Sequence, residues 1–413
     1  MLVADVRESS VGRSLPTGPT MADARTTAPS PQIRNPKSAI RNPKSAYLHV
    51  PFCAHRCGYC NFTLVAGRDD LIPAYLQALE LELQQLETPR EVDTIFLGGG
   101  TPSHLDAADL EMLLRIVAEW FPLRQGGEFS AEANPADLDD TRTAILAKAG
   151  VTRISLGAQS FDDNKLRVLE RDHAARDIVG AVDLARRYHL QVSLDLIFAV
   201  PGETVAGWQQ DLREAFQLEV NHISTYGLTF EQGTAFWSRR MKGELLETDE
   251  TDELAMYELA IDQLESNGFE QYEISNFAQP GFRCRHNEAY WTGEQYYAAG
   301  PGAARFVDDA RETNHRSTST YIRRMLGGQS PVAEREDLTA EDHARERLIF
   351  GLRRLEGIEL ETFQRQTGYD VDALAGEALE RFVAAGLLAR SADRLRLTRR
   401  GLVVSDSLWP DLL

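Results

Sequence analysis

Short apolar runs alternate with longer amphipathic stretches along most of the chain. The runs are rich in β-branched and aromatic residues and have the length of strands. They cover residues 47–50, 94–99, 128–133, 153–159, 192–200 and 222–228. The stretches between them place apolar residues three and four positions apart, as in residues 76–86, which indicates helices. Six strand-then-helix units predict an α/β fold, a partial TIM-like (β/α)6 barrel with right-handed crossovers.

Polar and small residues follow the predicted strands and do not precede them. Three cysteines come after the first run, and three glycines, residues 98–100, come after the second. Glu132 lies near the end of the third run, and Gln159 closes the fourth. Because chemistry in such barrels lies at the C-terminal ends of the strands, we expect these residues to share one mouth.

Three further segments flank the barrel, which we expect to occupy residues 47–235. Residues 1–46 are rich in Ser, Thr, Pro and Arg and contain the tandem heptad "IRNPKSAIRNPKSA". This composition favours a disordered tail over the alternative of a targeting peptide. Residues 236–335 are less regular and are expected to cover the mouth or to extend the sheet. Residues 336–413 are expected to form a smaller domain of their own.

This C-terminal domain has the pattern of a winged-helix-like module. A helix is predicted from Thr339, with Asp342 at the capping-box position. Shorter helices are predicted near residue 360 and over residues 375–388, followed by a hairpin over residues 388–398. The acidic balance of the chain favours a structural lid over a DNA-binding role for this module.

Charge and cysteine content narrow the possible functions. The 413 residues include 44 Lys and Arg against 63 Asp and Glu, a net charge of −19, which argues against a nucleic acid as the partner. No apolar run is long enough to span a bilayer and no secretory signal is recognisable, so we expect a cytoplasmic protein. Four cysteines give no disulfide framework, and clustered thiols in a reducing compartment favour metal binding.

The stretch "PFCAHRCGYCNF" contains Cys53, Cys57 and Cys60. Three thiolates leave one iron of a 4Fe-4S cluster without a protein ligand. That open position can take a small chelating ligand, much as a catalytic zinc keeps an exchangeable position. A zinc site is the alternative, because His49 and His55 lie nearby in the sequence.

The same stretch resembles the cluster motif C-x3-C-x2-C of the radical S-adenosylmethionine superfamily, in the branch of the oxygen-independent coproporphyrinogen oxidases. The segments "IFLGGGTPSHL", "EANP", "RISLGAQSFDDNKLRVLERDH", "DLIFAVPGET" and "YEISNFAQPGFRCRHNEAYW" match this branch in the same order. The resemblance implies a partial six-stranded barrel whose mouth holds a 4Fe-4S cluster and S-adenosylmethionine.

The resemblance also implies which residues contact S-adenosylmethionine. Tyr47 and Tyr59 would flank the cluster and the ligand. Contacts to the methionine end, the ribose, the amino acid part and the adenine are implied for Gly99, Gly100, Thr101, Glu132, Gln159, Arg171, Asp195 and Gly227. Asp195 is also supported by its own chemistry, because a carboxylate inside an apolar strand is costly to bury without a polar partner. For Arg171, an exposed charge at a helix end explains the sequence equally well.

Phe62 separates two groups within this branch. The coproporphyrinogen oxidases have a further cysteine at this position, and they have an N-terminal segment where this chain has its low-complexity repeat. The pattern C-x3-C-x2-C-x-F with the motif H-N-x-x-Y-W is similar to the HemW-type haem chaperones. The resemblance implies that haem is bound by His286, Asn287, Tyr290 and Trp291. The alternative is that these four residues only fix a loop and fill the core.

Cys284, two residues before His286, is a second candidate for the axial ligand of haem iron. The alternative is that it is a small buried side chain.

The favoured function is a haem chaperone that passes haem to acceptor apoproteins, among them membrane-associated respiratory proteins by resemblance. The alternative is an oxidase that decarboxylates coproporphyrinogen III. No catalytic residue is assigned. Whether the protein is an enzyme, whether it cleaves S-adenosylmethionine, and whether it is a monomer or a dimer stay open.

Overall fold

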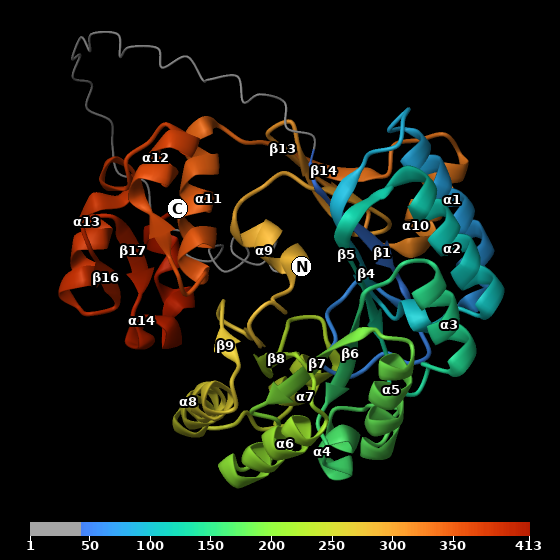
Figure 1. The fold of residues 1–413 in the computed structure, drawn as a ribbon, viewed down its shortest axis with the longest axis horizontal. Helices are drawn as coiled ribbons and strands as arrows, with labels where there is room; N and C mark the ends of the chain where they lie inside the picture. The colour runs from blue at the N-terminus through green and yellow to red at the C-terminus, as the bar shows by residue number, and fades with distance from the viewer. Residues whose placement is uncertain (1–42) are drawn as a thin grey trace. The chain divides into compact units, whose positions relative to one another are not determined.

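The computed structural model describes residues 43–413, and its elements are drawn in Figure 1. These residues divide into two compact units, each described by itself. The barrel unit runs up to Leu338 and includes Arg353–Glu356, and the C-terminal unit comprises Thr339–Leu352 and Gly357–Leu413. The tail expected over residues 1–46 lies outside the described residues, apart from its last four positions.

A nine-stranded sheet forms the centre of the barrel unit, in the order β11-β1-β4-β5-β6-β7-β8-β10-β9. Its six middle strands are the six predicted from the sequence, and each pairs in parallel with the next. They are β1 (Ser45–Val50), β4 (Val92–Gly99), β5 (Leu123–Ala133), β6 (Arg153–Gln159), β7 (Gln191–Phe198) and β8 (His222–Gly227). The predicted fold class, a partial (β/α)6 barrel, is therefore confirmed.

The less regular region after the barrel extends this sheet at both edges. β11 (Tyr297–Ala299) pairs in parallel with β1, whereas β10 (Asn276–Ala278) and β9 (Glu270–Gln271) add antiparallel strands beyond β8. The same region forms a separate antiparallel sheet from β12 (Ala304–Val307), β13 (Ala310–Asn314) and β14 (Val332–Asp337). Of the two roles expected for this region, extension of the sheet is observed.

Helices follow the strands and cover one face of the central sheet (Figure 1). Several begin at a side-chain cap, for example Asp106 before α2, Asp139 before α3 and Thr204 before α6. The helices of the barrel unit are α1 (Ile72–Gln84), α2 (Ala107–Trp120), α3 (Asp140–Lys148), α4 (Asp163–Val168), α5 (Ala175–Arg187), α6 (Val205–Gln217), α7 (Ala235–Met241), α8 (Glu250–Ser266), α9 (Arg285–Trp291) and α10 (Thr318–Leu326), with short 3-10 turns η2 (Asp69–Leu71) and η3 (Pro102–His104).

Side chains alternate between the two faces of each strand. On β1, Ala46, Leu48 and Val50 lie on one face and are fully buried, which places the apolar core on that side. The opposite face of β1 carries Tyr47, which stacks on Phe96 of the neighbouring β4. Helix α9 lies against this second face, because His286 of α9 stacks on Phe96 and bonds to Thr94 of β4.

The C-terminal unit contains the predicted helices and hairpin. Thr339 and Asp342 exchange the two hydrogen bonds of the expected capping box, at 3.2 and 3.1 Å. A third strand, β15, joins the hairpin at β17 and was not expected. The elements are α11 (Ala340–Arg353), β15 (Ile358–Glu359), α12 (Leu360–Thr367), α13 (Val371–Ala384), β16 (Leu388–Arg390), β17 (Arg394–Leu397), α14 (Arg399–Val403), η4 (Ser405–Ser407) and η5 (Trp409–Asp411).

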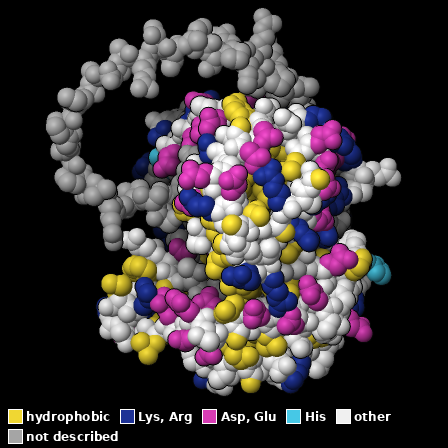
Figure 2. Space-filling view, turned by 90° about the vertical axis from the view of Figure 1, so that its left-hand side faces the viewer, with side chains coloured by type: hydrophobic (Ala, Val, Ile, Leu, Met, Phe, Trp, Pro, Cys, Tyr) yellow, Lys and Arg dark blue, Asp and Glu magenta, His cyan; other side chains and the backbone are white. Residues whose placement is uncertain are grey.

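Two features bear on nucleic acids and membranes as partners: the distribution of charge on the surface and the length and apolar character of the helices. On the face drawn in Figure 2, Lys and Arg side chains are interspersed with Asp and Glu side chains, and hydrophobic side chains lie between them. Within residues 43–413, no helix has both the length and the apolar character that crossing a bilayer requires.

Candidate functional site

The three clustered cysteines lie on one short loop at the C-terminal end of β1. Cys53 ends the short strand β2 (Phe52–Cys53), and the amide of Cys60 donates to the carbonyl of Cys57 over 3.1 Å. The strand β3 (Val65–Ala66) pairs with β2 and closes the loop. All three thiols are free, Cys53 buried and the other two half-buried. The loop therefore presents three sulfurs to the barrel mouth.

Each of the three sulfurs has a hydrogen-bond donor. The Thr101 hydroxyl lies 3.3 Å from Sγ of Cys53, and Nη1 of Arg171 donates to Sγ of Cys57 over 3.4 Å. The amide of Phe62 donates to Cys60. Burial raises the pKa of Cys53 to about 12 and also raises that of Cys60. Thiolate formation there needs a metal, and metal loading releases protons.

The surroundings of the three cysteines bear on the choice between a zinc ion and an iron-sulfur cluster. Among residues 43–413, no three His, Cys, Asp or Glu side chains are placed to hold one ion. Both ring nitrogens of His49 are engaged, Nε2 with the Thr63 carbonyl at 2.6 Å and Nδ1 with the Tyr47 hydroxyl at 3.0 Å. His49 therefore offers no free ring nitrogen to a zinc ion in this arrangement. A 4Fe-4S cluster makes a different demand, because each thiolate binds a different iron, and the loop supplies three free thiols for three irons.

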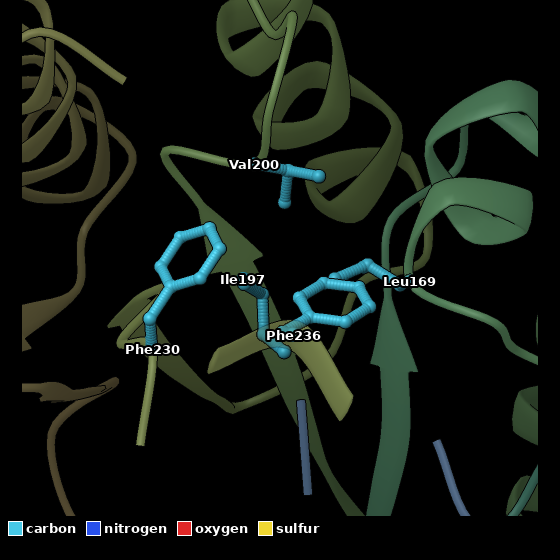
Figure 3. Close-up of a cluster of buried hydrophobic side chains, with 5 residues drawn as sticks. All are labelled: Leu169, Ile197, Val200, Phe230 and Phe236. Atoms are coloured by element: carbon cyan, nitrogen blue, oxygen red, sulfur yellow. The ribbon is translucent and has the colours of Figure 1, made fainter. Parts of the chain in front are cut away.

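An apolar cluster packs against the cysteine loop. Its buried members, shown in Figure 3, are Leu169, Ile197, Val200, Phe230 and Phe236, and Tyr59 packs against them. The amide of Phe236, in α7, donates to the Gly58 carbonyl over 2.9 Å. A Cβ atom at Gly58 would lie 2.4 Å from the Phe236 ring. Position 58 needs glycine because the ring approaches the loop backbone so closely.

The glycines after β4 pack against the chain itself. Gly99 has φ +104°, and a Cβ atom there would lie 2.2 Å from the His49 ring. The amide of Gly99 donates to Glu132 over 2.9 Å, and the amides of Gly100 and Thr101 donate to carbonyls of the β1–β2 segment. The structure thus gives these glycines an internal reason for lacking a side chain, and their predicted contact with S-adenosylmethionine stays a prediction.

The carboxyl groups of Glu132 on β5 and Asp195 on β7 interact electrostatically. Burial is the main cause that raises the pKa of Glu132 to about 8 and that of Asp195 to about 6. The Ser155 hydroxyl donates to Asp195 over 2.9 Å, so the polar partner expected for this buried carboxylate is present. Glu132 is therefore mostly protonated at neutral pH and able to donate a hydrogen bond.

The other predicted contacts to S-adenosylmethionine lie at strand ends. Gln159 ends β6 with φ +65°, a left-handed conformation that is uncommon outside glycine. Gly227 ends β8, where a Cβ atom would lie 3.0 Å from an oxygen of Glu253. Arg171 is half-buried and bonded to Cys57, so its interpretation as an exposed charge is wrong. The structure brings Arg171 and Thr101 to the cysteines, although the thiol contacts were not foreseen.

The motif H-N-x-x-Y-W forms α9 and lies deeper in the barrel. His286 is 1% exposed, with Nδ1 bonded to the Thr94 hydroxyl and Nε2 to the Tyr290 hydroxyl, each at 2.9 Å. Its ring stacks on Phe96 at 5.3 Å, and burial lowers its pKa to about 3. Trp291 is buried, and the Asn287 side chain bonds to a neighbouring tyrosine. In this arrangement neither nitrogen of His286 faces an open position.

α9 is also held at its first residues by a buried ion pair. The Glu128 carboxylate accepts from the amides of Arg285 and His286 at 3.2 and 3.1 Å and from the thiol of Cys284 at 3.4 Å. Arg153 pairs with Glu128 at 3.4 Å. This pair was not predicted from the sequence. The signal was a Glu and an Arg facing inward on adjacent strands, whose register the sequence does not reveal.

Comparisons with known proteins add to this geometry. Residues 47–215 match the radical SAM superfamily, and residues 338–404 match the HemN C-terminal domain. The "Heme chaperone HemW" of Mycobacterium tuberculosis is 37% identical over 375 residues, 89% of this chain and 94% of the relative. That of Lactococcus lactis is 34% identical over 372 residues, 89% of this chain and 97% of the relative. The chain belongs to the HemW family.

A solved structure supports the fold of this HemW family member. Coproporphyrinogen III oxidase (HemN) from Escherichia coli superposes with a TM-score of 0.80, covers 91% of each chain and is 20% identical. At that identity the likeness shows the fold alone. The match to the radical SAM superfamily implies a 4Fe-4S cluster and S-adenosylmethionine as cofactors.

Proposed function

We propose that the protein binds haem and passes it to acceptor proteins, and that it carries its 4Fe-4S cluster and S-adenosylmethionine at the barrel mouth. The observation that carries this proposal is the identity of 34 to 37% with relatives named heme chaperones, over nearly their whole length. Phe62 supports it, because this residue stands where the oxidases have a further cysteine. The Phe62 side chain is 42% exposed beside the cysteine loop.

At the mouth, Cys53, Cys57 and Cys60 would each bind one iron. When bound, the cluster supplies an electron and an open iron position for S-adenosylmethionine. Around it, the neutral carboxyl of Glu132 and the carboxylate of Asp195 offer hydrogen bonds of different kinds to hydroxyl and amino groups. The half-buried position of two of the cysteines leaves the loop accessible to such a ligand.

Further contacts are proposed for residues around these carboxyl groups. They are Tyr47, Tyr59, Gly99, Gly100, Thr101, Gln159, Arg171 and Gly227. All but Arg171 lie on the cysteine loop, on the strands or just after their ends, as a ligand shared by several strands of one barrel requires. Arg171 follows α4 and reaches the cysteine loop through its bond to Cys57.

For haem, we propose the α9 segment with His286, Asn287, Tyr290 and Trp291. Ligation of iron by His286 requires the bond from Nε2 to the Tyr290 hydroxyl to open, which costs about 1 kcal/mol for a neutral hydrogen bond. Cys284 is the weaker candidate for the axial ligand. Burial raises its pKa strongly, and its thiol donates to Glu128, so the thiolate is disfavoured.

Haem titration of the anaerobically reconstituted protein tests this function. We expect saturable binding followed by the Soret band, and transfer of the haem to apomyoglobin as a model acceptor. His286→Ala should weaken the binding. His222→Gln is the matched control, because His222 is also a buried histidine bonded at both nitrogens, to Ser193 and Tyr272. Binding that does not saturate, or equal losses in both variants, would contradict the proposal.

The oxidase alternative is tested by the product formed. Under anaerobic reducing conditions with S-adenosylmethionine, the chaperone should leave coproporphyrinogen III unchanged, and formation of protoporphyrinogen would establish the oxidase.

We also propose that the protein acts in the cytoplasm and that its acceptors include membrane-associated respiratory proteins. Cell fractionation with an antibody to the protein, and haem transfer to isolated apo-proteins of this class, test these two points.

A further inference from the structure

Arg171 joins the cysteine loop to the end of β6. Its Nη1 donates to Sγ of Cys57 over 3.4 Å. Its Nη2 donates to the carbonyl of Gly157 over 3.0 Å and lies 3.3 Å from Oδ1 of Asn134. A planar guanidinium fixed by two acceptors on one side has little freedom left, so Nη1 is directed at the sulfur.

The backbone around Arg171 is fixed as well. Leu169, two residues earlier, is fully buried in the apolar cluster of Figure 3. Glu170 adopts φ +56°, and the amide of Arg171 donates to the carbonyl of Leu166 over 2.9 Å. On the other side, the Asn134 amide donates to Asp172 over 2.8 Å, which orients the oxygen toward Arg171. The backbone of Arg171 and its acceptor Asn134 are therefore both held in place, which fixes the direction of the bond to Cys57.

The three sulfurs of the loop receive donors of different strength. Cys53 has the neutral hydroxyl of Thr101, and Cys60 has the neutral amide of Phe62. Cys57 has a cation, and hydrogen bonds from charged donors are about twice as strong as neutral ones. Burial opposes the charge on Arg171, but Tyr59 and Cys57 raise its pKa, and arginine stays protonated in proteins. Arg56 also lies beside the loop, but its Nη1 donates to the backbone carbonyl of Cys60 over 3.3 Å and not to a sulfur. Of the three sulfurs, that of Cys57 therefore receives the charged hydrogen bond.

We propose that Arg171 raises the reduction potential of the 4Fe-4S cluster through its charged hydrogen bond to the Cys57 thiolate. A one-electron reduction adds one negative charge to the cluster and its thiolates, and a donor cation at a thiolate stabilises the reduced form more than the oxidised form. This role rests on the proposed function, since it requires a cluster on the three cysteines. It is separate from the contact to S-adenosylmethionine that the sequence implies for the same residue.

The test is a redox titration of the cluster, followed by electron paramagnetic resonance, without S-adenosylmethionine. Arg171→Gln keeps a neutral donor and should lower the equilibrium constant for reduction about tenfold, which is about 59 mV for one electron. Arg171→Lys keeps the charge but offers one point donor and should shift the potential less. Arg239→Gln is the matched control, because Arg239 pairs with the adjacent Glu170 and makes no bond to sulfur. It should leave the potential unchanged.

The outcomes separate the two roles of Arg171. A shift in the absence of S-adenosylmethionine supports the proposal. A potential that changes only after S-adenosylmethionine is added would overturn it, because the residue would then act on that ligand. Equal shifts in Arg171→Gln and Arg239→Gln would also overturn it, since any nearby charge would suffice.

If Arg171→Gln binds no iron, the potential of Arg171→Lys decides. Loss of the cluster in both variants would show that the bond holds the cluster and does not tune its potential, which would overturn the proposal. Haem binding by the wild-type protein is measured separately, so failure of the chaperone function is distinguishable from failure of this role.

Discussion

The barrel mouth and the α9 end of the same barrel are built in different ways. At the mouth, two thiols are half-buried and three sulfurs receive one donor each, which leaves their lone pairs for metal. At α9, His286 is bonded at both nitrogens and Glu128 is paired with Arg153 while it caps the helix. The mouth is thus arranged to accept a ligand, and the α9 end is closed by its own hydrogen bonds.

The positions of these two regions along β4 show how one strand serves both. Gly99, at the C-terminal end of β4, lies at the mouth, whereas Thr94, which binds His286, is five residues earlier. Five residues of a strand span about 16 Å. A haem that reaches His286 therefore requires α9 to release contacts that the cysteine loop does not share.

The largest expected effect is at the mouth. Cys53→Ala, Cys57→Ala or Cys60→Ala should each abolish the 4Fe-4S cluster, because two thiolates do not hold it. Cys284→Ala, at the α9 end, should keep the cluster. Iron and sulfide content and the charge-transfer absorbance of the reconstituted variants give the measurement. A cluster that depends on Cys284 would remove the distinction between the two regions.

The next effect is at the α9 end. Glu128→Ala leaves Arg153 buried without its carboxylate and should lower the free energy of unfolding by roughly 3 to 5 kcal/mol. Urea unfolding measures the change. Glu91→Ala is the control, because Glu91 and Arg124 form an exposed pair worth no more than about 1 kcal/mol. Equal losses in the two variants would show that the α9 end is not held by this pair.

A pH effect is expected from Glu132. Its pKa in the folded protein is about 8, above the ordinary value of 4.5, so the folded state binds more protons than the unfolded state between these pH values. The contribution of Glu132 to stability therefore falls as pH rises from 4.5 to 8, by on the order of 3 kcal/mol. Glu132→Gln removes this dependence. The difference in unfolding free energy between wild-type apo-protein and this variant should decrease from pH 5 to pH 8, and a difference that stays constant would refute the assignment.

The smallest of these effects is expected at the support of the cysteine loop. Gly58→Ala brings a methyl group against the Phe236 ring and should cost roughly 1 to 3 kcal/mol. Gly180→Ala is the control, because Gly180 lies in α5 with open space around it and alanine is favoured in helices. Thermal unfolding compares the two, and Phe236→Leu in the Gly58→Ala background should recover part of the loss. If both substitutions stabilise the protein, the close packing of the loop on α7 is refuted.

Local patterns in the sequence were sufficient for the framework. Six apolar runs gave six parallel strands, and the residues that follow them lie at strand ends, because strand periodicity and barrel topology are encoded over short stretches. Thr339 and Asp342 form the predicted capping box, since such a cap needs only three residues of spacing. An extension of the sheet by residues 236–335 was one of the two expected roles, but the individual strands β11, β10 and β9 were not located, because strands of two or three residues leave little periodic signal.

By itself, the sequence determined that three cysteines share one loop at the C-terminal end of the first barrel strand. Only the tertiary structure decided what meets this loop, Arg171 at Cys57 and Phe236 against Gly58. It also decided that Glu128 holds the start of α9, away from the loop. Cys57 and Arg171 are 114 residues apart in the sequence, and Gly58 and Phe236 are 178 apart. Glu128 and His286 are 158 residues apart. No local spacing encodes such contacts, because they depend on the register of strands and on how the sheet curves until its polar faces meet.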